Sequence, residues 1–173
     1  IRALDTQSVY RTLSLVYVPI MAGAYDMALR DLEAARQQAP RNPDVLKLQG
    51  QLLLQQEKTD EAIAVYQNYN RQFPDDRQIT FVLARLMVNA GQTEEAESFV
   101  DELLGVNEEN ALLNQLKATI LAAKENSEDA QVYAEKSIMS GRSDPVVRLI
   151  AGYSAYKNGD FEAATRHLSY IAS

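Results

Sequence analysis

The sequence contains no cysteine, no tryptophan and a single histidine among its 173 residues. These absences exclude disulfide bonds, thiol catalysis and cysteine-based zinc clusters, and they leave little for histidine-based acid–base or metal chemistry. The one histidine, His167, falls on the last predicted helix, where we expect a partly exposed surface residue. The sequence therefore disfavours most classes of enzyme, and we expect no catalytic residue, metal or cofactor.

Positive charge and long apolar runs are also scarce. The 17 Lys and Arg residues against 24 Asp and Glu residues give a net charge of −7, and no basic run offers a surface for a phosphate backbone, so we expect no nucleic-acid partner. The longest apolar stretch, residues 15–22, is far shorter than the about 20 residues of a membrane-spanning helix, which predicts no direct membrane insertion. The chain begins at Ile1 without a signal-peptide pattern, and we interpret it as a fragment of a longer protein. Its compartment stays open between a bacterial periplasm or envelope and the cytoplasm.

An internal repeat organises what is present. Alanine recurs every 34 residues, at Ala28, Ala62, Ala96, Ala130 and Ala164. Five residues before each alanine stands a turn residue: Gly23, Glu57, Gly91, Glu125 or Gly159. Twelve residues before each alanine the residue is mostly small: Val16, Gly50, Ala84, Ala118 or Gly152. Because three columns keep one phase without a gap, the chain is a repeat array, in which we expect the small residues to let paired helices approach closely.

Helix-start signals place two helices in each repeat. Short polar residues that accept backbone N–H bonds at a helix start recur with the repeat at Asn42, Asp76, Asn110 and Asp144. A second signal is a hydroxyl residue before an acidic pair, and it predicts that Thr59, Thr93 and Ser127 cap the second helices. Apolar residues recur at helical spacing, and no segment alternates as a strand does. The sequence therefore predicts an all-α protein.

A 34-residue helix–turn–helix unit with these columns resembles the tetratricopeptide repeat family. The resemblance implies an α-solenoid, a right-handed superhelix of about five units that together form one array over residues 1–173. We place the units at residues 9–42, 43–76, 77–110, 111–144 and 145–173. The sequence departs from the family pattern near the start of the first helices, where the family has a large aromatic residue and this chain has Thr12, Leu46, Thr80, Asn114 and Arg148. Gln49 and Lys117 depart from it at the next apolar position.

The resemblance also implies a concave surface, lined by the first helices, that binds a protein or peptide partner. The candidate partner-binding residues are Tyr17, Lys47, Gln51, Phe81, Arg85, Gln115, Tyr153 and Tyr156. The alternative is that the aromatic residues among them pack between neighbouring first helices. Tyr66 and Tyr69, on a second helix, are expected in the core. Some members of the family grip a terminal carboxylate with Lys and Asn residues, but the later positions of that clamp hold Val82, Leu112 and Leu116, which disfavours this mode.

Three functional hypotheses follow. The first is a non-catalytic scaffold or adaptor that binds a partner segment in the groove. The second is a structural spacer or self-association element in a bacterial envelope, secretion or exopolysaccharide assembly protein. The uncovered apolar residues Leu168, Tyr170 and Ile171 at the end of the last helix are compatible with further repeats or with end-to-end association of two copies. The third is an enzyme, or a regulatory domain attached to an enzyme elsewhere in the full protein.

Overall fold

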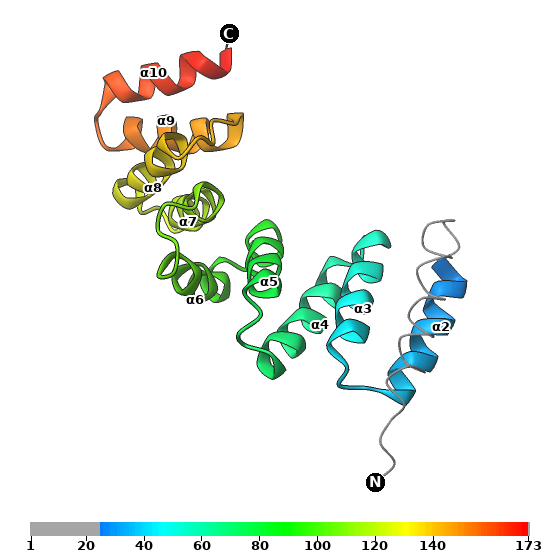
Figure 1. Ribbon diagram of the computed structural model, residues 1–173. Helices are drawn as coiled ribbons and strands as arrows, with labels where there is room; N and C mark the ends of the chain where they lie inside the picture. Colours follow the sequence, from blue (N-terminus) through cyan, green and yellow to red (C-terminus); the bar gives the residue numbers. More distant parts are fainter. Residues whose placement is uncertain (1–24, 173) are drawn as a thin grey trace. The chain divides into compact units, whose positions relative to one another are not determined.

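A computed structural model describes residues 25–172, which form helices joined by short turns (Figure 1). The helices are α2 (Tyr25–Gln38), α3 (Pro43–Gln55), α4 (Thr59–Gln72), α5 (Arg77–Asn89), α6 (Thr93–Leu104), α7 (Ala111–Ala123), α8 (Ser127–Met139), α9 (Pro145–Lys157) and α10 (Phe161–Ala172). From α3 onward, first helices begin at residues 43, 77, 111 and 145 and second helices at 59, 93, 127 and 161, so each series advances by 34 residues. The all-α prediction and the phase of the repeat are confirmed.

The internal contacts divide the chain into an N-terminal lobe, residues 1–80, and a C-terminal lobe, residues 81–173. In the N-terminal lobe, α3 packs against both α2 and α4. In the C-terminal lobe, consecutive helices from α6 to α10 pack against one another, and α7 also contacts α9. Each lobe therefore stacks helices in chain order, as expected for a helical repeat.

The first helices begin where the sequence predicts. The side chains of Asn42, Asn110 and Asp144 each accept two backbone N–H bonds from the first turn of α3, α7 and α9. Asp76 Oδ1 accepts the N–H of Ile79 at 3.3 Å and serves α5 in the same way. These four side chains satisfy N–H groups that have no partner within the helix.

The predicted caps of the second helices are wrong by one residue. Thr59, Thr93 and Ser127 are the first residues of their helices, and the capping positions are Lys58, Gln92 and Asn126. Neither Lys58 nor Gln92 makes a side-chain capping bond. The acidic pairs do lie in the first turns, where they interact favourably with the helix dipole.

The turn residues before the second helices adopt the left-handed conformation. Gly91 and Gly159 have φ of 77° and 82°, and Glu57 and Glu125 have φ of 61° and 60°. The left-handed conformation is easy for glycine and strained for a residue with a Cβ atom. The turn therefore has the same backbone conformation in these four repeats, including the two that have glutamate in place of glycine.

The small-residue column lets a large side chain of the second helix approach the first helix. A Cβ atom on Gly50 would lie 2.6 Å from Tyr66 Cε1, and one on Gly152 would lie 2.7 Å from Leu168 Cγ. In both pairs the contacting residue is 16 positions further along the chain. At the same two positions of another repeat, Ala118 and Ala134 pack in one buried cluster. The recurring alanines from Ala28 to Ala164 are buried as well, and so are Tyr66 and Tyr69, as predicted.

Polar contacts replace the missing family residues near the helix starts. Thr80 Oγ1 donates to Asn70 Oδ1 at 2.7 Å, and Asn114 Nδ2 donates to the Glu108 carbonyl at 2.8 Å. The buried Lys117 ammonium lies 2.9 Å from Glu97 Oε1 and 2.6 Å from Asp101 Oδ1, so α6 supplies two carboxylates for the lysine of α7. Burial alone would lower the pKa of Lys117, but these hydrogen bonds outweigh it and raise the pKa.

Candidate functional site

Among the first helices that the structure describes, α9 has the most exposed apolar surface, a stripe along one side. Val146, Leu149, Tyr153 and Tyr156 are 55–58% exposed, and we call them the α9 stripe. Their spacing of three, four and three residues places them on one face of the helix. The Tyr156 ring lies 5.9 Å from the Phe161 ring in an edge-to-face arrangement, which extends the aromatic surface to the start of α10.

A hollow of about 200 Å³ adjoins the α9 stripe. Tyr153, Ser154 and Lys157 line it from α9, and Ala122 and Ala123 line it from α7. Both helices are first helices of their repeats, which is where the resemblance places the binding surface. The remaining lining residues, Glu125 and Ser127, add a carboxylate and a hydroxyl. The hollow can therefore receive an apolar side chain next to polar groups of both charges.

Other predicted site residues of the C-terminal lobe differ in their surroundings. The Arg85 guanidinium lies 5.9 Å from the Phe81 ring on α5, and the Arg85 side chain is exposed. Gln115, by contrast, is buried: its amide oxygen accepts a hydrogen bond from Arg142 Nε, and its nitrogen lies 3.4 Å from Asp144 Oδ1. Gln115 therefore fixes the turn before α9 and does not form an open contact surface.

In the N-terminal lobe, Lys47 is engaged within the protein. Its ammonium lies 2.7 Å from Asp76 Oδ2, and the Tyr69 hydroxyl donates to the same oxygen at 2.7 Å. The hydrogen bond to Asp76 raises the pKa of Lys47. Gln51, four residues further along α3, is exposed. Tyr17, the remaining predicted site residue, lies outside the described residues.

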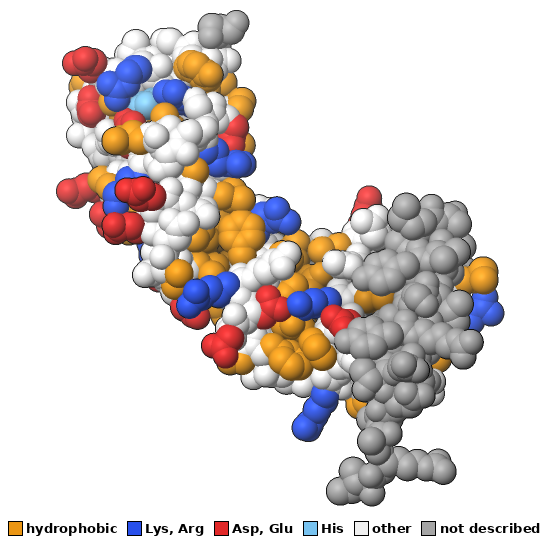
Figure 2. Space-filling view, in the orientation of Figure 1, with side chains coloured by type: hydrophobic (Ala, Val, Ile, Leu, Met, Phe, Trp, Pro, Cys, Tyr) orange, Lys and Arg blue, Asp and Glu red, His pale blue; other side chains and the backbone are white. Residues whose placement is uncertain are grey.

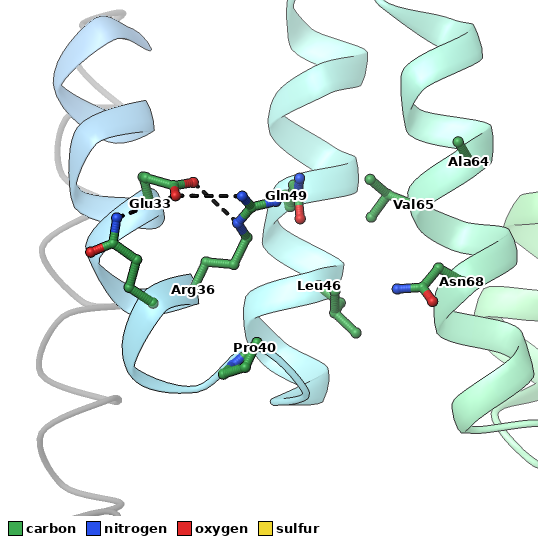
Figure 3. Close-up of a pocket in the computed structure, with 9 residues that line it drawn as sticks. Glu33, Arg36, Pro40, Leu46, Gln49, Ala64, Val65 and Asn68 are labelled. Carbon is green, nitrogen blue, oxygen red and sulfur yellow. Dashed lines mark hydrogen bonds and ion pairs between the residues drawn. The ribbon is translucent and has the colours of Figure 1, made fainter.

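A larger hollow, of about 490 Å³, lies between α2, α3 and α4 (Figure 3). Leu46, Val65, Ala64 and Pro40 form its apolar lining. Arg36 of α2 points toward Gln49 of α3, and its Nε lies 3.1 Å from Glu33 Oε2 (Figure 3). The polar lining consists of this ion pair and the amides of Gln37, Gln49 and Asn68. These groups suit contact with a polypeptide and supply no nucleophile paired with a base.

The expectation that His167 is partly exposed is wrong, because its exposed fraction is 1%. The pattern of α10 by itself does not indicate this burial, because α8 and α9 supply the groups that contact the imidazole. Across residues 25–172 we find no cluster of three acidic or histidine side chains arranged to hold a metal ion. None of the described helices is long and apolar enough to cross a membrane.

Comparison with known proteins places the chain in a family. A family model described as "Tetratricopeptide repeat" matches residues 20–80 and 53–120, together more than half of the chain. The chain belongs to the tetratricopeptide repeat family, whose repeats mediate protein–protein interactions.

Solved structures share the fold. MamA (residues 41 to the end) from Desulfovibrio magneticus RS-1 is 14% identical, with a TM-score of 0.82 over 95% of this chain and 93% of that protein. A tetratricopeptide repeat protein from Parabacteroides merdae is 21% identical, with a TM-score of 0.80 over 95% of this chain and 66% of that one. Among curated proteins, "Cellulose synthase 2 operon protein C" of Komagataeibacter xylinus is 29% identical over 149 residues. The match covers 84% of this chain and only 11% of that much longer relative.

Proposed function

We propose that the chain is a non-catalytic binding module, one continuous tetratricopeptide array whose first helices hold a segment of a partner protein. The observation that carries the proposal is the α9 stripe beside the hollow between α7 and α9. Large exposed apolar and aromatic side chains in one row are typical of interaction surfaces. Lys47 and Gln115 hold intramolecular contacts, so the partner contacts centre on Tyr153 and Tyr156, with the exposed Arg85 and Gln51 and the half-buried Phe81 as further candidates.

The spacing of the α9 stripe favours a helical partner segment. Apolar residues three and four positions apart match the seam through which two helices pack side by side. From Val146 to Tyr156 the stripe runs the length of α9, so a partner helix of about three turns covers it. The partner is expected to carry apolar residues at the same three-and-four spacing, because only that pattern keeps them on one face.

Site-specific photo-crosslinking in the native cell tests the proposal. A photoreactive phenylalanine derivative replaces Tyr153, and a matched variant carries it at Met139, an exposed apolar residue of α8. We expect a discrete protein adduct at position 153 that is absent at position 139 and is lost when Leu149→Ser is added. Equal adducts at both positions, or none at position 153 despite expression of folded protein, contradict the proposal.

A second candidate function is that of a spacer or self-association element in an exopolysaccharide assembly protein. Two observations favour it: the similarity to the cellulose synthase operon protein, and the apolar end of α10, where Leu168, Tyr170 and Ile171 are each at least partly exposed. In this candidate function the ends of the array, and not the first-helix face, carry the contacts. Sedimentation at increasing protein concentration separates the two: association that Ile171→Glu abolishes and Tyr153→Ala leaves unchanged supports the spacer, and a concentration-independent monomer opposes it.

A further inference from the structure

His167 is a buried histidine between three helices. Its Nε2 lies 2.6 Å from Glu135 Oε1 of α8, and its Nδ1 lies 2.9 Å from Arg148 Nη1 of α9. In Figure 2 the pale blue of this one histidine lies among basic and acidic side chains near the C-terminal end of the chain. The imidazole is thus a polar link between α8, α9 and its own helix, α10.

The two neighbours determine where the imidazole proton lies. A guanidinium group only donates hydrogen bonds, so the contact with Arg148 requires an unprotonated Nδ1 that accepts. The single proton of the neutral ring is then on Nε2, which donates to the Glu135 carboxylate. The geometry therefore describes a neutral histidine with a defined tautomer.

A second proton changes one of these contacts and preserves the other. The bond from Nε2 to Glu135 is compatible with both charge states. Protonated Nδ1, in contrast, places an N–H opposite the guanidinium, so two donors and two positive charges meet. Arg166 of α10, whose Nη2 lies 3.4 Å from Nε2 and 3.2 Å from Glu135 Oε1, adds a second positive group beside the ring.

Besides His167, Arg148 of α9 contacts a second residue of α10, Tyr170. Its guanidinium lies 4.5 Å from the centre of the Tyr170 ring, and its Nε donates to Ser143 Oγ at 2.9 Å. One turn further along α9, Gly152 receives Leu168 and the Cβ of His167 at close distance. Displacement of Arg148 therefore removes contacts at two residues of α10, His167 and Tyr170.

We propose that His167 and Arg148 form a proton-operated latch between α9 and α10. In the neutral state Arg148 donates to Nδ1 and holds α10 against the start of α9. Protonation of Nδ1 turns the acceptor into a donor and releases Arg148, while Glu135 keeps its bond to Nε2. Uptake of one proton by the imidazole is therefore the signal that opens the latch.

Amide hydrogen exchange at two pH values tests the latch. Protection factors, which correct for the intrinsic pH dependence of exchange, are measured at about pH 8 and about pH 5.5. We expect protection in α10 to fall about tenfold at the lower pH, the factor that corresponds to loss of one charge-assisted hydrogen bond, and protection in α3 and α4 to stay unchanged. Equal protection of α10 at both values overturns the proposal.

Two variants identify the residues responsible. His167→Gln keeps one donor and one acceptor but cannot take up a proton, so α10 is expected to stay protected at both pH values. Arg148→Met removes the guanidinium, and α10 is expected to show the lower protection already at about pH 8. A pH response in His167→Gln as large as in the parent overturns the latch. Circular dichroism first establishes that each variant is folded.

Nitrogen-15 NMR of the parent gives a test that needs no variant. The chain has one histidine, so its ring signals are unambiguous. Near pH 8 we expect the chemical shifts of a ring protonated on Nε2 and unprotonated on Nδ1. A ring protonated on Nδ1 at that pH overturns the proposal, because that ring cannot accept from Arg148.

Discussion

The α3–α4 pair and the α9–α10 pair have the same geometry but different chemistry at their contact. Both place a glycine of the first helix, Gly50 or Gly152, against a large side chain of the second helix. Two other positions differ between the pairs. Leu46 of α3 and Val65 of α4 correspond, three repeats later, to Arg148 of α9 and His167 of α10. Leu46 and Val65 line a hollow, whereas Arg148 and His167 are hydrogen-bonded to each other.

The difference shows which positions determine the repeat. The small residue sets how closely the helices approach, and neighbouring positions can be filled by apolar contact or by a directional polar contact. Apolar contact does not depend on pH, whereas a hydrogen bond through an imidazole does. A repeat can therefore acquire a new chemical response without a change in its packing.

The largest expected effect comes from replacing the recurring alanine of the α3–α4 pair by a larger residue. Ala62 is fully buried, so Ala62→Leu overpacks the core and is expected to lower the free energy of unfolding by about 3 kcal/mol. The matching change, Ala164→Leu, is one turn before Leu168, which is 38% exposed and can move, so it is expected to cost less. Urea denaturation of both variants measures the difference, and equal costs would mean that the two pairs tolerate extra volume alike.

Gly50→Ala compared with Gly152→Ala tests the close approach itself. The new methyl group at residue 50 meets the buried Tyr66 ring, and we expect a loss of about 2 kcal/mol even after the better helix propensity of alanine is included. At residue 152 the methyl group meets Leu168, which is 38% exposed and can move, and lies 3.3 Å from the Cβ of His167, so that variant is expected to lose less stability than Gly50→Ala. A neutral Gly50→Ala variant would show that the Tyr66 ring is not fixed by its surroundings.

Alkaline pH is expected to affect the Tyr66 contact and not the Leu168 contact. Burial raises the pKa of Tyr66 to about 12 from its ordinary value near 10. Its contribution to stability is complete below about pH 10 and is lost as the pH rises toward about 12, because the unfolded tyrosine ionises first, with a limit of roughly 2 kcal/mol.

Tyr66→Phe is the control for the alkaline effect. Thermal unfolding of the parent and the variant across this range isolates Tyr66 from the other tyrosines. If both lose stability in parallel, Tyr66 is not the residue responsible.

The smallest effect concerns the turns of the two pairs, which have Glu57 and Gly159 at matching positions. Both residues have positive φ, so Glu57→Gly removes backbone strain and is expected to stabilise the protein by about 1 kcal/mol. The reverse experiment, Gly159→Ala, is expected to destabilise it by a similar amount. Differential scanning calorimetry measures both, and a loss of stability in Glu57→Gly would contradict the strain argument.

The sequence predicted the fold well because the repeat signals are local. Asn42 and Asp144 act within three residues of their own position, and the apolar spacing lies within single helices, so one sequence is enough to find them. Contacts between helices were harder to predict. His167 meets Glu135 from 32 residues away, and nothing in the pattern of α10 indicates that encounter.

The candidate site was predicted only in outline. Tyr153 and Tyr156 are exposed as the helical spacing suggests, and the spacing also gave Gln115 and Lys47. Gln115 and Lys47 each contact a residue in the turn that follows the next helix. Gln115 contacts Arg142, and Lys47 contacts Asp76. Periodicity identifies the face on which a side chain lies, but it does not indicate whether a distant loop already occupies that side chain.

The lysine cluster of α6 and α7 has a consequence for how similar repeats find their correct neighbours during folding. Lys117 meets Glu97 and Asp101, whereas one repeat earlier the same two positions hold Ile63 and Gln67. If α7 docked one repeat out of order, it would bury an ammonium group against an aliphatic side chain and a neutral amide. Because an unpaired buried charge is strongly unfavourable, the cluster distinguishes the correct partner helix from its near-copy.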